Sequence, residues 1–235
     1  MLLLLLAFPA PRRARVVMMD TGSVTWASLR IRLDQVPVFA IDAADGACTV
    51  YIDVDCARSA GNPYPTGLGT AYERAFRSSS ALEPTHANHV TIVAAPHDVA
   101  LASSLPGGED IDWESGEIPL FGSYSMRRRL KDGRQVAPLF FSGLEAQKAL
   151  EEATSPGVQV PELRSLSLQQ MVEDMLSGRQ KNSDGLHFVA PAASVRFTQE
   201  VQAGALPTKI DARLAMLSLF DGTMDARRSG SVFPT

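Results

Sequence analysis

The sequence predicts an α+β fold of two pseudo-repeated halves arranged around an antiparallel sheet with flanking helices. Two observations lead to this prediction. The segment at 36–39 (VPVF) recurs as 118–121 (IPLF), and an Asp-Gly pair follows each copy. The strand and helix signals that come after each pair also follow the same order. Self-similarity at a long period indicates two copies of one supersecondary unit.

Each half is predicted to open with a hairpin. Asp45-Gly46 and Asp132-Gly133 each precede an apolar extended segment, at 49–54 and at 136–141. An Asp-Gly pair supplies the positive backbone angles of a tight hairpin turn between segments of high strand propensity.

A helix is expected after each hairpin. In the second half Ser142 and Glu145 form a capping box, which favours a helix beginning there. Its apolar face is Ala146, Ala149, Leu150 and Ala153. In the first half, the residues that recur at helical spacing are Leu68, Tyr72, Ala75, Phe76 and Ser79. The breakers Pro63 and Pro65 precede this weaker pattern.

A further strand and helix complete each half. The segment 89–93 leads into a short helix at 98–103, and the segment 163–168 leads into an amphipathic helix at 168–176. Met171 and Met175 lie on that helix. They are interpreted as core residues in preference to client-binding residues, although a flexible thioether suits promiscuous apolar binding.

The predicted organisation has four parts. Residues 1–30 are a targeting remnant and leader, 31–105 the first α+β repeat, 106–194 the second repeat and 195–235 a C-terminal helical tail. A segment rich in breakers and acids at 105–110 separates the halves. The second repeat ends with a short strand at 186–189 before Pro191, and the tail is expected to form a helix over Ile210, Leu214, Leu217 and Phe220.

Composition argues against several classes of protein. Of the 235 residues, 45% are hydrophobic and 20% are charged, which are ordinary values for a folded globular chain. The net charge of −4 argues against a nucleic-acid partner, because such proteins present a basic face to phosphates. Arg127, Arg128 and Arg129 are the local exception, interpreted as a solvated edge or turn.

The N-terminus resembles a targeting segment. An apolar run at 2–8 is followed by the basic residues Arg12, Arg13 and Arg15. The run is too short to cross a bilayer, which takes roughly twenty apolar residues. It resembles a signal-peptide core before a basic, acid-poor stretch, and the step at 7–11 resembles a signal-to-transit junction. We expect the mature chain to be soluble or peripheral.

Possible metal and redox sites have simpler interpretations. His86, His89 and His97 are close in sequence, but no cysteine or spaced carboxylate completes a metal shell. Cys48 and Cys56 are interpreted as reduced residues of one strand. Asp110, Asp112, Glu114 and Glu117 could hold calcium but lack the ligand register of a loop site, so they are interpreted as a solvated linker.

The sequence shows no recognisable catalytic motif. Gly67-Leu68-Gly69 before a helix resembles a nucleotide loop but lacks the third glycine and the downstream acid. Neither a nucleophile elbow nor paired carboxylates with a nearby histidine occur. We therefore predict a protein that is not an enzyme and has no cofactor.

Four segments resemble the soluble twenty-two kilodalton Tic proteins of chloroplasts, cyanobacteria and apicoplasts. They are IPLFGSYSMRRRLKDG, VAPLFFSGLEAQKALEEA, LRSLSLQQMVEDMLSG and LHFVAPAAS, which together span roughly 118–194. In the first half VPVFAIDAADG resembles the family's first strand, whereas CARSAGNPYPTGLG departs from its usual acidic segment.

The resemblance implies two similar halves that share an antiparallel sheet around a pseudo-twofold axis. It also implies a chaperone-like factor that assists preprotein import across plastid envelope membranes, located in the intermembrane space or an equivalent compartment. The partners would be unfolded preproteins and subunits of the Tic translocon. The alternative is a peripheral structural subunit of a plastid membrane complex, and a third class is an enzyme on an unrecognised fold.

The repeated strands are the candidate client-binding site, because apolar strand edges and grooves bind extended peptides through backbone pairing and side-chain pockets. The other interpretation is that these strands pack in the core. The candidate residues are Val36, Val38, Phe39, Ile118, Leu120 and Phe121.

Overall fold

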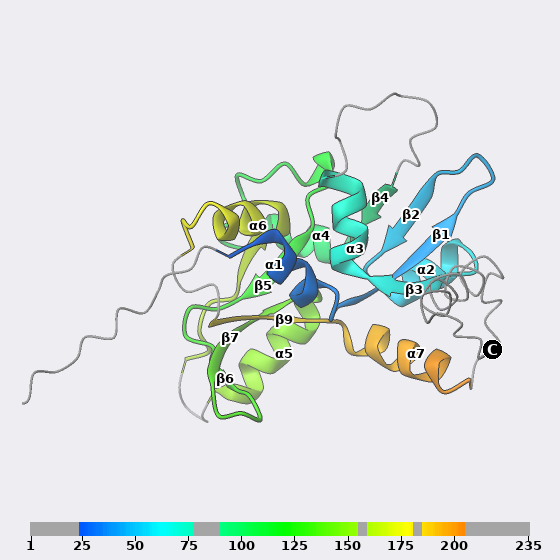
Figure 1. Cartoon of the computed structure of the whole chain (residues 1–235). Helices are drawn as coiled ribbons and strands as arrows, with labels where there is room; N and C mark the ends of the chain where they lie inside the picture. The colour runs from blue at the N-terminus through cyan, green and yellow to red at the C-terminus, as the bar shows by residue number, and fades with distance from the viewer. Residues whose placement is uncertain (1–23, 78–89, 155–158, 181–184, 205–235) are drawn as a thin grey trace, which may run out of the picture.

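The computed structural model describes residues 24–77, 90–154, 159–180 and 185–204. These residues form a mixed α+β fold, which confirms the predicted fold class (Figure 1). The strands belong to two separate sheets and not to one shared sheet, and each sheet includes one parallel pair among antiparallel ones.

The first sheet has the order β3-β1-β2-β4. Its strands are β1 (Pro37–Asp42), β2 (Cys48–Tyr51), β3 (Tyr64–Gly67) and β4 (Val90–Val93). The second sheet has the order β6-β7-β5-β8, and β9 also pairs with β7. Its strands are β5 (Pro119–Gly122), β6 (Arg128–Arg129), β7 (Gln135–Phe140), β8 (Arg164–Ser167) and β9 (Leu186–Val189).

Helices connect the strands in both halves. The first half contains α1 (Trp26–Leu33), α2 (Val54–Ala60), α3 (Leu68–Tyr72), the π-helical turn η1 (Glu73–Arg77) and α4 (Pro96–Ser104). The second contains the 3-10 turn η2 (Trp113–Ser115), α5 (Gly143–Ala153), α6 (Leu168–Leu176) and α7 (Ala192–Gln202).

Both predicted hairpins are present. Gly46 and Gly133 have φ angles of 88° and 84°, so each adopts the left-handed conformation that glycine tolerates best. The side chains of Asp45 and Asp132 each accept a hydrogen bond from the backbone N–H two residues further on, which closes the turn.

The two sheets have the same strand register. Pro37 lies opposite Gly67 in the first sheet, as Pro119 lies opposite Ser167 in the second. The carbonyl of Val36 accepts a hydrogen bond from the N–H of Leu68. Ile118 and Leu168 make the same bond in the second half. This agreement supports the predicted internal repeat, and the predicted boundaries at 105 and 194 stay predictions.

The correspondence between the halves differs from the one that the sequence suggested. By pairing, β3 corresponds to β8 and β4 to β9, whereas the sequence had matched the segment at 89–93 with that at 163–168. The sequence patterns did not predict α2 and β3. The side chain of Asp53 accepts a hydrogen bond from the N–H of Cys56 and begins a helix there, so placing Cys56 in a strand was wrong.

A central core joins the halves. It contains Val38 and Val50 from one face of the first sheet and Leu120 and Phe141 from the second half, together with buried residues of α1, α3 and α6. The opposite face of each sheet is covered separately: α2 and α7 pack over Phe39, and Phe121 lies in a cluster with residues of α4 and α5.

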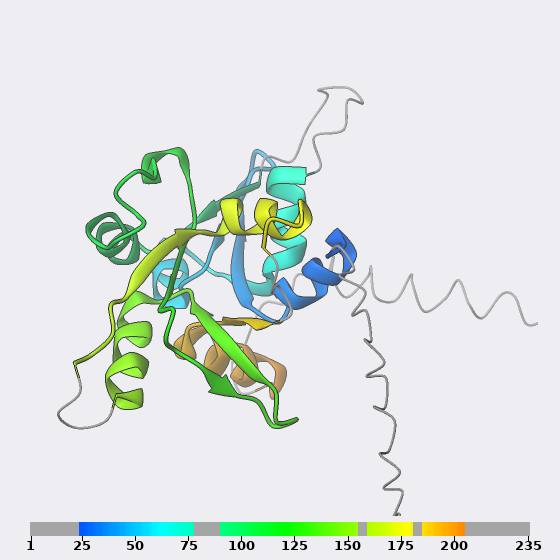
Figure 2. The same cartoon turned by 90° about the vertical axis from the view of Figure 1, so that its left-hand side faces the viewer.

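The last helix of each half packs against the sheet of the other half. Figures 1 and 2 show α7 beside β3 and α2, although α7 follows β9 of the second sheet. The hydroxyl of Ser194 on α7 donates a hydrogen bond to the carbonyl of Ile52. In the other direction, Asp98 on α4 accepts a hydrogen bond from the N–H of Gly143 at the start of α5. The two halves are therefore tied together by exchanged helices.

Several predicted features lie outside the described residues. They are the leader at 1–23, His86 and His89, Ser79 and the tail helix over 210–220. Within the described ranges, no helix is long and apolar enough to cross a membrane.

Candidate functional site

A surface groove of the described residues lies beside β8 and α6. Its volume is about 410 Å³. Ile111, Leu166 and Met171 provide the apolar part of its wall. The polar part includes the carboxylates of Asp112, Glu117 and Asp174, together with Ser115, Ser167 and Gln170. We call this feature the acidic groove.

The segment at 105–117 forms one wall of the acidic groove, and Trp113 anchors it in a buried cluster with residues of α4 and α5. Trp113 is buried, and its Nε1–H donates to the carbonyl of Gly108 at 3.0 Å. Asp112 begins η2 by accepting a hydrogen bond from the N–H of Glu114. Gly116 ends the turn with φ 90°. The predicted linker is therefore an ordered wall of a groove.

The facing wall comes from β8 and α6. Ser167 is the N-cap of α6, accepts a hydrogen bond from the N–H of Gln170, and donates its own hydroxyl proton to Glu117. Asp174 accepts hydrogen bonds from Gln170 and from Nε of Arg179, the latter at 2.7 Å. Most of the polar groups are thus held in position before any ligand arrives.

A second groove, of about 390 Å³, lies between β3 and α7. Its lining includes Gln35, Pro65, Thr66, Val195 and Gln199. In the shared register Thr66 corresponds to Leu166 of the acidic groove. The grooves therefore border corresponding edge strands, but the second one carries a single carboxylate, Asp34.

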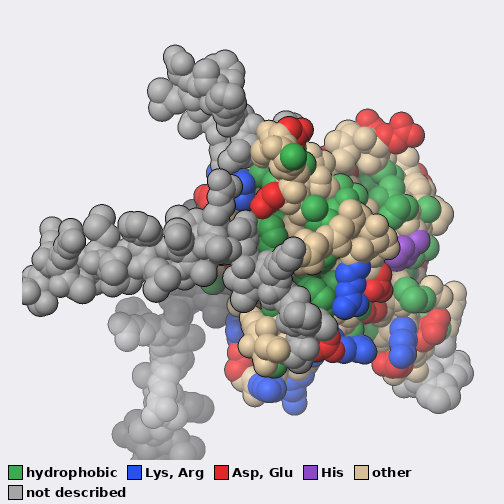
Figure 3. All heavy atoms as spheres, turned by 90° about the vertical axis from the view of Figure 1, so that its right-hand side faces the viewer, with side chains coloured by type: hydrophobic (Ala, Val, Ile, Leu, Met, Phe, Trp, Pro, Cys, Tyr) green, Lys and Arg blue, Asp and Glu red, His purple; other side chains and the backbone are tan. Residues whose placement is uncertain are grey.

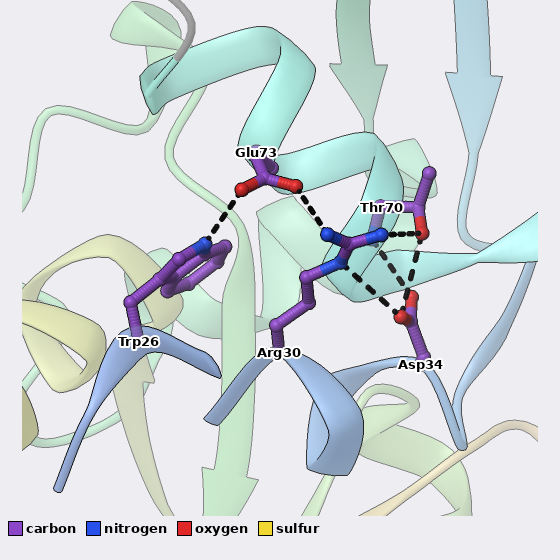
Figure 4. A network of polar contacts seen from close by, with 5 residues as sticks. All are labelled: Trp26, Arg30, Asp34, Thr70 and Glu73. Atoms are coloured by element: carbon purple, nitrogen blue, oxygen red, sulfur yellow. Dashed lines mark hydrogen bonds and ion pairs between the residues drawn. The ribbon is translucent and has the colours of Figure 1, made fainter. Parts of the chain in front are cut away.

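The Asp34 carboxylate is part of a polar network between α1 and α3 (Figure 4). Its Oδ1 accepts a hydrogen bond from the N–H of Thr70 at 2.7 Å, and its Oδ2 accepts one from the Thr70 hydroxyl. Arg30 pairs with Glu73 at 2.8 Å, and the indole N–H of Trp26 donates to the same Glu73 at 2.9 Å.

This network explains the Gly67-Leu68-Gly69 segment. A Cβ at Gly67 would lie 2.3 Å from Oδ1 of Asp34, and one at Gly69 would lie 2.3 Å from the carbonyl oxygen of Arg30. The glycines allow α1 to approach the N-terminus of α3. The place where a phosphate would bind a helix N-terminus holds a carboxylate of the chain itself.

The six predicted client-binding residues are buried. Val36 is 1% exposed, and the other five are 0% exposed. They are Val36, Val38, Phe39, Ile118, Leu120 and Phe121. A client would have to open the sheets to touch them in this arrangement. Their part in client binding stays a prediction.

Arg127, Arg128 and Arg129 are exposed, and the last two form β6, which confirms the solvated edge predicted for this run.

His97 is exposed and lies 3.5 Å from Asp98. Within the described ranges, no group of three potential metal ligands occurs.

Both cysteines are free thiols. Burial is the main reason that the pKa of the Cys56 thiol is raised to about 11, and the neighbouring Asp53 carboxylate raises it further. Burial also raises the pKa of Cys48. Both thiols therefore stay protonated near neutral pH and are weak nucleophiles.

Apolar side chains also reach the molecular surface. Ile31 is 65% exposed on α1, and Leu144 is 71% exposed on α5. Figure 3 shows hydrophobic side chains in patches on one face, interrupted by acidic and basic ones. Sequence periodicity had not identified the grooves, because each combines segments that only the fold brings together.

The fold defines a class of α+β proteins with two similar mixed sheets joined by exchanged helices. No family model matches the chain, and no curated protein matches it in sequence. Two solved structures share the fold over almost their whole length.

The first is Tic22 from Plasmodium falciparum, at 15% identity and a TM-score of 0.57, covering 75% of this chain and 98% of that one. The second is Anabaena Tic22, whose description gives protein transport. It has 14% identity and a TM-score of 0.55, and the match covers 78% of this chain and 98% of that one. The chain has the Tic22 fold, which confirms the predicted resemblance at the level of structure.

Proposed function

We propose that the protein is a non-enzymatic, chaperone-like factor that assists preprotein import across plastid envelope membranes. The observation that carries the proposal is the fold shared with two Tic22 proteins over 98% of their length, one of them described as acting in protein transport. The partners would be unfolded preproteins and subunits of a Tic complex in the chloroplast or a related plastid. The protein would act in the envelope intermembrane space, soluble or bound peripherally, without a cofactor.

The surface supports a binding role. Two open grooves border the edge strands β3 and β8, and each combines apolar with polar side chains. Extended polypeptides bind such places through side-chain pockets beside a strand. The buried residues of the repeated strands would support the grooves from beneath.

Affinity capture from intact plastids, after brief crosslinking, tests this proposal. We expect many preproteins and the translocon subunits to be captured together with the tagged chain. Constant stoichiometry with one complex and no preproteins would favour the alternative, a peripheral structural subunit. Capture of neither class would contradict both functions.

A further inference from the structure

We propose that the acidic groove binds the arginine or lysine side chains of an extended client polypeptide. The inference rests on the proposed function, to which it adds the chemical class of polypeptide and the place where it binds. Its basis is the combination of an apolar wall with carboxylates in one groove of about 410 Å³.

The apolar wall fits the stem of a long basic side chain. Ile111, Leu166 and Met171 are each partly exposed along the groove. Arginine and lysine place their methylene groups along apolar surface while the charged end stays at a polar rim. The thioether of Met171 adapts to stems of different shape.

The rim has the charge that a basic ligand requires. The segment at 107–117 contains Glu109, Asp110, Asp112, Glu114 and Glu117 and no lysine or arginine. Asp174 adds a carboxylate from α6, although Arg179 already pairs with it. Arg164 lies near Gly107 at the margin, where it pairs with Glu162 and stacks on Tyr124.

The occupant follows from charge complementarity. Leaders that direct proteins into plastids are amphipathic, rich in arginine and poor in acids, so they carry both an apolar surface and positive charge. Acidic clients gain nothing at this rim. The second groove is lined by one carboxylate, Asp34, where the acidic groove is lined by three, so it lacks this charge complementarity.

A peptide pair tests the inference. The probe is a labelled, acid-free peptide of about twenty residues containing arginine, leucine and serine, and its partner has citrulline at every arginine. Fluorescence anisotropy measures both against the full chain. We expect the arginine peptide to bind more tightly, and its advantage to shrink when salt rises from about 0.05 M to about 0.5 M.

Protein variants locate the site. Asp112→Asn combined with Asp174→Asn removes two carboxylates while keeping side chains that accept hydrogen bonds, and Asn is a good N-cap for η2. We expect arginine-peptide binding to weaken by about twofold to twentyfold, as for two exposed ion pairs. The matched control is Glu200→Gln, which changes an exposed residue of α7, a helix that lies away from α6 in Figures 1 and 2, and it should leave binding unchanged.

The outcomes separate this inference from the proposed function. Equal binding of the two peptides, or equal loss in Glu200→Gln, overturns the groove assignment but leaves a client-binding role intact. Competition by calcium alone at micromolar concentration would make the groove a cation site and also overturn the inference. In each case circular dichroism is used to check that the variant is folded.

Discussion

Asp34 caps the N-terminus of a helix to which it does not belong. Its Oδ1 accepts the hydrogen bond of the Thr70 N–H at 2.7 Å, across from the end of α1 to the first turn of α3. Gly67, the N-cap residue of α3, has no side chain to do this. In the second half Ser167 caps α6 with its own hydroxyl. The corresponding starts of α3 and α6 are thus capped by different side chains, Asp34 from another helix in one half and the N-cap residue Ser167 in the other.

Removing this cap should destabilise the protein. We expect Asp34→Ala to lower the free energy of unfolding by about 1 kcal/mol and Asp34→Asn to lower it less, because asparagine also accepts the bond. Urea unfolding monitored by circular dichroism measures both changes. An unchanged Asp34→Ala midpoint would show that the cap contributes nothing.

The close approach of α1 and α3 gives a separate prediction at Gly69. Gly69→Ala places a methyl group against the carbonyl oxygen of Arg30, so we expect a loss of roughly 1–3 kcal/mol. Gly185→Ala is the control, because a Cβ there meets no atom within 4 Å. Equal stability of the two variants in urea would contradict the packing described.

The repeated phenylalanines are predicted to act first through folding. Phe39 and Phe121 are fully buried on the outer faces of the two sheets. Phe39→Ala should cost about 3–5 kcal/mol, and Phe39→Asp or Phe121→Asp should unfold the chain, since a charge would be buried without a partner. The control Leu144→Asp changes an exposed residue. A folded Phe39→Asp protein, judged by circular dichroism, would refute this core assignment.

Asp98 should make stability depend on pH. Burial raises the pKa of this carboxyl, although the Gly143 N–H and His97 act in the opposite direction. A raised folded-state pKa means that stability falls as pH rises from about 4 through that pKa, because the buried group must then ionise. Asp98→Asn keeps the acceptor for Gly143 and should be more stable than the natural chain at pH 7.

Thermal unfolding of the Asp98→Asn and natural chains from pH 4 to pH 7 provides the measurement. The difference between their melting temperatures should grow with pH. A constant difference, or one that shrinks with rising pH, would show that Asp98 ionises freely in the folded state.

The sequence predicted the elements that carry strong local signals. Asp45-Gly46 predicted a hairpin because its turn chemistry is local, and Ser142 with Glu145 predicted α5 for the same reason. The short β3 was missed because Pro65 resembles a breaker. The proline is tolerated because β3 is an edge strand, which among the described strands pairs with β1 alone.

The tertiary features had no local signal. Nothing in the segment at 192–202 indicates that Phe197 packs on Phe39 of the other half, at a ring-centroid distance of 5.3 Å. The sequence shows part of the acidic groove, because Asp112 and Glu117 belong to an acidic segment. Its apolar wall depends on Met171 and Leu166, which the fold brings to the same place.

The association with membranes is predicted to be peripheral. We expect alkaline carbonate to release the protein into the supernatant, because the sequence after residue 8 contains no apolar run of the roughly twenty residues that a spanning helix needs. Retention with integral proteins in the pellet would contradict this prediction.

Suppression of aggregation tests the chaperone-like role most directly. A chemically denatured model client is diluted into buffer with increasing amounts of the folded natural chain, without nucleotide, and light scattering is followed. We expect scattering to fall as the chain approaches and exceeds the client concentration, and added nucleotide to change nothing. Undiminished scattering at every ratio would contradict the chaperone-like role and favour the structural-subunit alternative.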